Sequence, residues 1–257
     1  MKNKKTKWCV LFIAAAAVFT ASMVLLGYIL YNSYFTKANY SSFVSSAAPA
    51  SSEPELPQNP IDFTALHQKN TDIYAWIKIP NTVIDYPVLQ STDKDDDFYL
   101  NHDIDRSYKF AGSIFSEKMN RTDFSDPVTV LYGHNMLNGT MFQNLHKFRN
   151  KAFFDANKTI YIYTPGHILT YEIFSAYKYD DRHIMNSFDF SDLTVRQEYF
   201  QYIQSPKSML VNTRPVNLTN DSKILTLSTC IGNEDHYRYL VQGVLTNDQP
   251  TKKFDNK

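Results

Sequence analysis

The sequence predicts a mainly-β fold, a closed or nearly closed antiparallel barrel with peripheral helices, preceded by one transmembrane helix. Three observations predict it. Short apolar runs with an alternation of two are separated by turn residues from residue 77 to residue 245. Hydrophobic residues make up 43% of the 257 residues and aromatic residues 15%, which is enough to bury a core. The first 31 residues differ, because they hold a basic stretch followed by one long uncharged run.

The N-terminal segment predicts a membrane anchor. Residues 1–7 carry four lysines and no acid, and residues 8–31 carry no charge. A helix of that length would measure roughly 36 Å, enough to cross a hydrocarbon core of about 30 Å. Lysines before the span predict a cytoplasmic tail at 1–7 and an extracellular remainder. A cleaved signal peptide is the alternative, but the apolar region of such a peptide is usually only about 7–15 residues long.

Residues 32–60 predict an extracellular linker, and residues 61–257 predict one domain. The stretch SSFVSSAAPASSEPELPQNP at 41–60 is rich in Ser, Ala, Pro and Glu and too poor in apolar residues to fold. The remainder shows no internal repeat, and its length suits a single domain.

Within 61–257 the apolar pattern predicts strands interrupted by helices. Ile61–Trp76 has the spacing of an amphipathic helix or of two short ones. The predicted strands are Ile77–Ile79, Val83–Leu89, Gly112–Phe115, Val128–Tyr132, Thr159–Tyr163, Ile168–Tyr179, Lys223–Thr229 and Tyr237–Leu245. Two further helices are predicted at Met141–Phe148 and Asp192–Gln204, the second with Ser191 as its N-cap.

Charge and motif content exclude several classes of function. The 26 basic and 26 acidic residues cancel, so the chain lacks the electrostatic footprint of a nucleic-acid-binding protein. With 7 glycines in all, it has no Gly-rich phosphate-binding loop. The acidic run at 93–97 lacks the central Gly of an EF-hand loop, and no paired His/Cys spacing occurs. We therefore expect neither a metal ion nor a cofactor.

Cys230 is the residue that indicates chemistry. The other cysteine, Cys9, lies in the predicted membrane span, so Cys230 has no intramolecular disulfide partner in an exported domain. It follows the alternating run Ile224–Thr229, shares one strand face with Ser228, and precedes a polar segment, 231–237, that is predicted to be a loop. A thiol held at a strand end suits a nucleophile. The alternative is a small buried hydrophobe.

His134 and Arg238 are the predicted partners of that thiol. His134 comes just after the strand Val128–Tyr132, whereas the other six histidines are expected to be solvated, with His236 the one rival. Arg238 lies eight residues beyond Cys230, and antiparallel pairing would return its guanidinium beside the thiol. A fixed positive charge favours a thiolate and can bind the oxyanion of a tetrahedral intermediate.

Together these residues resemble a sortase, and more narrowly a class B sortase. The segment Leu225–Cys230 (LTLSTC) resembles the family's TLxTC motif, with Arg238 at the expected strand start. Tyr132-Gly133-His134 resembles the family's histidine segment. The stretch 180–215, with its predicted helix, is similar to the insert of class B, and the resemblance covers nearly all of 61–257.

The resemblance implies an eight-stranded sortase barrel and a cysteine transpeptidase of the thiol protease class. Cys230 would attack the carbonyl after Thr in a C-terminal sorting signal and form a thioester. His134 would protonate the leaving amine and deprotonate the incoming one, while Arg238 would hold the oxyanion and Ser228 would contact the peptide. The implied partners are surface proteins that bear a sorting signal, an amine of a peptidoglycan precursor, and the cell membrane through residues 8–31.

Two other functions remain open from the sequence. One is a different surface thiol peptidase or an L,D-transpeptidase, although the latter keeps its His and Cys close together, whereas 95 residues separate His134 from Cys230. The other is a membrane-tethered binding module in which Cys230 is buried. Phe188 and Phe190 of the insert are expected to pack in the core rather than to line a groove.

Overall fold

The computed structural model describes residues 19–31, 56–232 and 234–252. The chain divides into two compact units, Met1–Ser42 and Phe43–Lys257, and each is described by itself.

In the first unit, residues 19–31 form a helix. The predicted tail, residues 8–18 of the predicted span and residues 32–55 of the predicted linker lie outside the described residues. Of the helices in the described part of the chain, none has the length and apolar character that crossing a bilayer requires.

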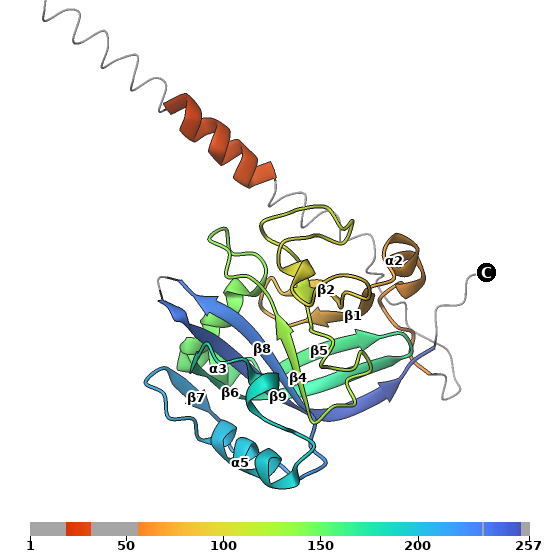
Figure 1. Cartoon of the computed structure of the whole chain (residues 1–257), viewed down its shortest axis with the longest axis vertical. Coiled ribbons are helices and arrows are strands. Elements are labelled where there is room, and N and C mark those ends of the chain that lie inside the picture. Colours follow the sequence, from red (N-terminus) through yellow and green to blue (C-terminus); the bar gives the residue numbers. More distant parts are fainter. Residues whose placement is uncertain (1–18, 32–55, 233, 253–257) are drawn as a thin grey trace, which may run out of the picture. The chain divides into compact units, whose positions relative to one another are not determined.

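In the second unit the described residues form nine strands in one sheet, and eight of them close into a barrel (Figure 1). The strands are β1 (Ile73–Lys78), β2 (Asp85–Leu89), β3 (Ile114–Phe115), β4 (Val128–Tyr132), β5 (Thr159–Thr164), β6 (His167–Asp180), β7 (Val211–Thr213), β8 (Ile224–Ile231) and β9 (Glu234–Pro250). Their order is β5-β1-β2-β3-β4-β8-β9-β6-β7, and an additional β5–β6 pairing closes the ring. The short strand β7 is an extra strand on β6. The eight-stranded barrel is thereby confirmed.

The sequence predicted an antiparallel barrel, and in this respect the prediction was wrong. The pairs β2–β3 and β4–β8 are parallel. In the second pair Val128–Tyr132 runs beside Ile224–Ser228, with Tyr132 opposite Ser228. Both strands therefore end at the same edge of the sheet. The sequence pattern could not reveal this, because side chains alternate with a period of two in both kinds of ladder.

Helices lie around the barrel. They are α2 (Phe63–Lys69), α3 (Lys151–Ala156), α4 (Ile184–Ser187) and α5 (Leu193–Gln204), with the 3-10 helices η1 (Phe98–Leu100) and η2 (Phe142–Arg149).

Two predicted helix boundaries were wrong. The helix predicted over Ile61–Trp76 ends at Lys69, because Asn70 adopts an extended backbone and its side chain donates to Tyr99, after which the chain enters β1. The N-cap of α5 is Asp192 rather than Ser191. The Asp192 carboxylate accepts hydrogen bonds from two backbone N–H groups of the first turn, as a good N-cap does.

The segment 231–237, predicted to be a loop, belongs mostly to strands. β8 continues to Ile231 and β9 begins at Glu234, so Cys230 lies within a strand. His236 is a strand residue whose side chain is 89% exposed, with a ring nitrogen 3.4 Å from Asp181. The polar composition suggested a loop because His236 and Tyr237 are strand residues whose side chains face solvent.

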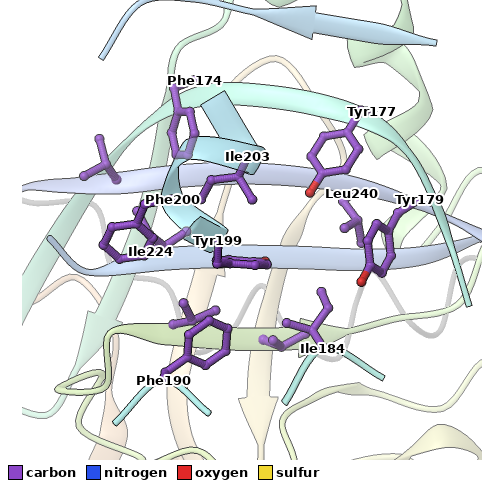
Figure 2. Packing of buried hydrophobic residues seen from close by; sticks show 13 residues of the cluster. Phe174, Tyr177, Tyr179, Ile184, Phe190, Tyr199, Phe200, Ile203, Ile224 and Leu240 are labelled. Carbon is purple, nitrogen blue, oxygen red and sulfur yellow. The ribbon is translucent and has the colours of Figure 1, made fainter. Parts of the chain in front are cut away.

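The insert between β6 and β8 is held by an apolar cluster (Figure 2). The buried members are Val128, Val130, Phe174, Tyr177, Tyr179, Ile184, Phe190, Tyr199, Phe200, Ile203, Ile224, Leu240 and Val244. Phe188 packs against this cluster, with its ring 4.8 Å from that of Tyr199. Phe190 is thus buried in the cluster and Phe188 is partly buried against it, as predicted, but both side chains also line the pocket of about 600 Å³ at the insert. Since Ile184 stands near the start of the insert, this cluster fixes where the insert leaves the barrel.

Candidate active site

A pocket of about 280 Å³ lies where β4, β8 and β9 meet the start of the insert. Its lining residues are Leu100, Tyr132, Gly133, His134, Tyr179, Asp181, Arg182, His183, Ile184, Ser228, Thr229, Cys230, Arg238 and Leu240. The four site residues predicted from the sequence are all among them. Two larger pockets, of about 450 and 600 Å³, contain none of the four.

Strand pairing brings the thiol and the guanidinium together. Cys230 and Arg238 are direct partners across the antiparallel pair β8–β9, as the sequence predicted. Ser228 lies two residues earlier, on the same face of β8, and is buried. Cys230 itself is exposed, which contradicts the alternative of a buried small hydrophobe.

The segment that carries His134 is attached to β8 by backbone hydrogen bonds. Gly133 N donates to Ser228 O at 3.2 Å, and the Thr229 hydroxyl donates to Gly133 O at 2.8 Å. On the other side, Phe142 N donates to His134 O at 2.9 Å. A Cβ at Gly133 would lie 2.5 Å from the side chain of Ile114 and 2.8 Å from the ring of Phe142, so a larger residue here would have to displace both side chains. His134 is therefore held at the same edge as Cys230.

A backbone carbonyl selects the tautomer of His134. Nε2 of the ring lies 2.8 Å from Leu100 O. Because a carbonyl oxygen only accepts, Nε2 carries the hydrogen, and Nδ1 of the neutral ring holds the lone pair that can take a proton. The ring of Phe110 stacks on the imidazole with 5.6 Å between centroids.

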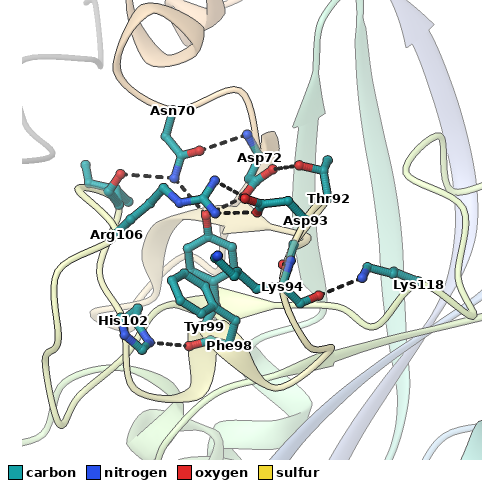
Figure 3. A network of polar contacts seen from close by, with 12 residues as sticks. Asn70, Asp72, Thr92, Asp93, Lys94, Phe98, Tyr99, His102, Arg106 and Lys118 are labelled. Atoms are coloured by element: carbon teal, nitrogen blue, oxygen red, sulfur yellow. Dashed lines mark hydrogen bonds and ion pairs between the residues drawn. The ribbon is translucent and has the colours of Figure 1, made fainter.

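Leu100 is in turn fixed by a buried polar network (Figure 3). The fully buried Asp72 carboxylate accepts hydrogen bonds from Tyr99 Oη at 2.6 Å and from Arg106 Nη1 at 3.1 Å. Thr92 Oγ1 donates to the same carboxylate at 2.7 Å. Burial and the hydrogen bond to Asp72 raise the pKa of Tyr99, so its hydroxyl stays a donor at neutral pH. Since Tyr99 adjoins Leu100, the network holds the carbonyl that orients His134.

The opposite wall of the pocket is also braced by a histidine. His183 Nδ1 accepts from Asn186 N at 3.1 Å, so Nε2 carries the hydrogen that bonds Glu117 at 2.5 Å. The ring of Tyr132 lies 6.3 Å from that of His183, and burial, followed by the charge of Glu117, raises the pKa of Tyr132. Tyr132 therefore presents a neutral hydroxyl. The sequence gives no sign of this contact, because 66 positions separate Glu117 from His183 and no motif joins them.

His146 was predicted to be solvated, and the structure corrects this. Its Nε2 lies 3.1 Å from the carbonyl oxygen of Cys230. Burial, and next the charge of Arg149, lower the pKa of His146 to about 4, so the ring is neutral at pH 7. Among the residues that the structure describes, no group of three or more His, Cys, Asp or Glu side chains is arranged to hold a metal ion.

Comparison with known proteins decides the family. The sequence model of the sortase domain matches residues 77–246. The chain belongs to the sortase family. Sortase B of Listeria monocytogenes is 37% identical over 184 residues, which cover 70% of this chain and 72% of that protein.

Solved structures agree. Sortase B of Clostridium perfringens is 36% identical, with a TM-score of 0.65 over 72% of this sortase and 100% of that chain. The Staphylococcus aureus sortase B–substrate complex is 31% identical, with a TM-score of 0.65 over 76% of this sortase and 87% of that chain. These relatives confirm the class B resemblance. This sortase is therefore a cysteine transpeptidase.

Gly112→Ala is expected to damage both stability and catalysis in this sortase. Gly112 has a φ of +56°, and a Cβ there would lie 2.2 Å from Leu100 O, the oxygen that accepts from His134. We expect kcat/KM to fall by about tenfold or more, since one misplaced hydrogen bond to a catalytic group is worth that much. Urea unfolding and a peptide-cleavage assay measure the two effects.

Gly139→Ala is the matched control. Gly139 also has a positive φ, +82°, but a Cβ there would meet nothing within 4 Å. Its variant should lose only the roughly 1–2 kcal/mol that a left-handed backbone costs a non-glycine residue, and it should keep its activity. Equal losses of activity in both variants would show that contact with Leu100 is not what matters.

Proposed function

We propose that this sortase cleaves a C-terminal sorting signal after Thr and joins the new carboxyl end to an amine of a peptidoglycan precursor. The observation that carries the proposal is the convergence of Cys230, His134 and Arg238 on one pocket. The family supplies the reaction class, and the pocket supplies the groups that the reaction needs.

In the first half of the reaction the thiolate of Cys230 attacks the carbonyl carbon of Thr, on the N-terminal side of the bond that is cleaved. The thiol proton passes to His134, whose Nδ1 is the proton-accepting nitrogen because Nε2 bonds Leu100. The oxygen of the tetrahedral intermediate gains a negative charge, which the guanidinium of Arg238 stabilises. Collapse of the intermediate breaks the C–N bond, His134 gives its proton to the leaving amine, and a thioester remains on Cys230.

In the second half an incoming amine attacks the thioester. His134 takes a proton from that amine, Arg238 again binds the oxyanion, and the C–S bond breaks to return the thiol. The new amide bond conserves the energy of the peptide bond that was cleaved, so no cofactor is required.

The peptide lies along the pocket beside Ser228, whose position two residues before Cys230 on one strand face makes it a contact for the peptide backbone. One solved relative is a sortase B–substrate complex from Staphylococcus aureus, which supports a substrate for this sortase as well. Surface proteins that bear a sorting signal are the proposed clients.

We further propose that residues 8–31 anchor this sortase in the cell membrane, with residues 1–7 in the cytoplasm and the catalytic domain outside, beyond the linker at 32–60. The uncharged run and the lysines before it support this arrangement.

Substitution of Cys230 tests the chemistry. Cys230→Ala should abolish cleavage of sorting-signal peptides and the thioester adduct seen by mass spectrometry, because no other residue in the pocket is a thiol. Arg238→Ala should lower kcat by about 10²–10³-fold, as the loss of an oxyanion donor does. Arg121→Ala, at an arginine that is 75% exposed and outside the pocket, is the control and should change nothing. Cleavage that persists in Cys230→Ala would refute the proposed nucleophile.

The pH dependence of the reaction tests whether Cys230 and His134 act together. The active form holds one proton between Cys230 and His134, so a second proton inactivates it on the acid side and loss of that proton inactivates it on the alkaline side. We expect kcat/KM for peptide cleavage to follow a bell with two ionisations. A flat profile between about pH 6 and pH 9 would contradict the shared proton.

Fractionation of cells tests the anchor. The full-length chain should stay with the membranes after an alkaline carbonate wash and should leave them in detergent, because an inserted helix is not removed by charge screening. Mass spectrometry of the purified protein should find residues 1–7. A mature N-terminus that begins after residue 31 would instead establish the cleaved signal peptide.

A further inference from the structure

We propose that His146 is a positioning residue for the nucleophile: its Nε2–H supplies the hydrogen bond that the neighbouring strand cannot give to the backbone of Cys230. The inference rests on the proposed function in taking Cys230 as the nucleophile. It concerns a residue that lies outside the lining of the pocket.

The place where the β4–β8 ladder ends explains why Cys230 needs a donor. Carbonyl groups two residues apart on a strand point to the same side, so the carbonyls of Ser228 and Cys230 both face β4. Ser228 O accepts from Gly133 N. Pairing of β4 stops opposite Ser228, so β4 offers no partner to the next carbonyl on that side. There, Nε2 of His146 lies 3.1 Å from Cys230 O.

The ring makes this one hydrogen bond at a cost. In the described part of the chain, Nδ1 of His146 is buried and has no hydrogen-bond partner. A buried polar atom without a partner is unfavourable, and an apolar side chain would avoid that cost. We attribute the imidazole at this position to its other nitrogen, Nε2, which donates a hydrogen bond to the carbonyl oxygen of Cys230.

The contacts of the ring reach both strands of the hairpin. The imidazole lies 5.3 Å from the ring of Tyr239 on β9, next to Arg238 in the chain. Arg149, the last residue of η2, places its guanidinium over the same Tyr239 ring, 5.0 Å from the centroid. Thus η2 packs against β8, which carries the nucleophile, and against β9, which carries the arginine. His146 makes the hydrogen bond from η2 to β8.

The charge state of the ring suits this task. The groups that face it are Arg149 from η2, the carbonyl of Cys230 from β8 and the Tyr239 ring from β9. Burial and Arg149 keep the ring neutral above about pH 5, because they lower its pKa to about 4. A neutral ring holds the backbone of the nucleophile without adding a charge next to it.

Two substitutions at His146 test the proposal. His146→Leu removes the donor and keeps an apolar side chain, whereas His146→Gln keeps an amide donor. Because one hydrogen bond contributes about 1 kcal/mol, His146→Leu should lower kcat roughly five- to tenfold with KM within about twofold. His146→Gln should recover most of that loss. Iodoacetamide at pH 7 should alkylate Cys230 severalfold more slowly in His146→Leu than in the wild type. In the variant the position of the thiol beside Arg238 is less well fixed.

His67→Leu is the matched control. His67 also has a ring nitrogen bonded to a backbone carbonyl, that of Ile73 at 2.7 Å, but it lies outside the active-site pocket. Its variant should keep both kcat and the alkylation rate, whatever it does to the melting temperature.

The outcomes are distinct. Unchanged kcat and alkylation in His146→Leu would overturn the proposal. So would equal losses in the Leu and Gln variants that follow their melting temperatures, since that pattern marks a purely structural residue. If the wild-type chain cleaves no sorting-signal peptide, the proposed function fails, and the comparison of alkylation rates still decides whether His146 positions Cys230.

Discussion

The parallel pairing of β4 with β8 is the constraint on which the site depends. Parallel strands end at the same edge of a sheet, so the residues that follow Tyr132 and Ser228 emerge side by side although they are far apart in the chain. The antiparallel partner β9 then returns Arg238 to the same place. Three reactive groups thus meet because of strand direction, and the barrel around them keeps the edge from moving.

Hydrogen bonds to two backbone carbonyl groups fix the positions of the reactive residues. Leu100 O sets the tautomer of His134, and Cys230 O is held by a second histidine, His146. Each carbonyl or its donor is held in turn by a neighbouring element. The hydrogen bonds of Asp72 hold the segment that bears Leu100, and η2 holds His146. These hydrogen bonds use Nε2 of His134 and the carbonyl oxygen of Cys230, and not the Nδ1 and Sγ atoms that take part in the proposed reaction.

The sequence predicted those features that depend on local pattern. Alternation located most strands, and the three residues that the pattern singled out, Cys230, His134 and Arg238, line one pocket. What it could not predict depends on contacts between distant residues. The strand β7 is three residues long and exists through its pairing with β6. The contact of Glu117 with His183 and that of His146 with Cys230 have no local signature, and polarity at 231–237 resembles that of a loop although the residues pair.

Ile184 belongs both to the apolar cluster that holds the insert and to the wall of the pocket. The residues just before it, Asp181 and Arg182, line the same wall but are exposed and outside the cluster. A substitution at Asp181 would therefore change the lining of the pocket without removing a side chain from the apolar cluster. Exposed side chains that line the pocket and buried side chains that hold the fold thus stand within a few neighbouring positions of the insert.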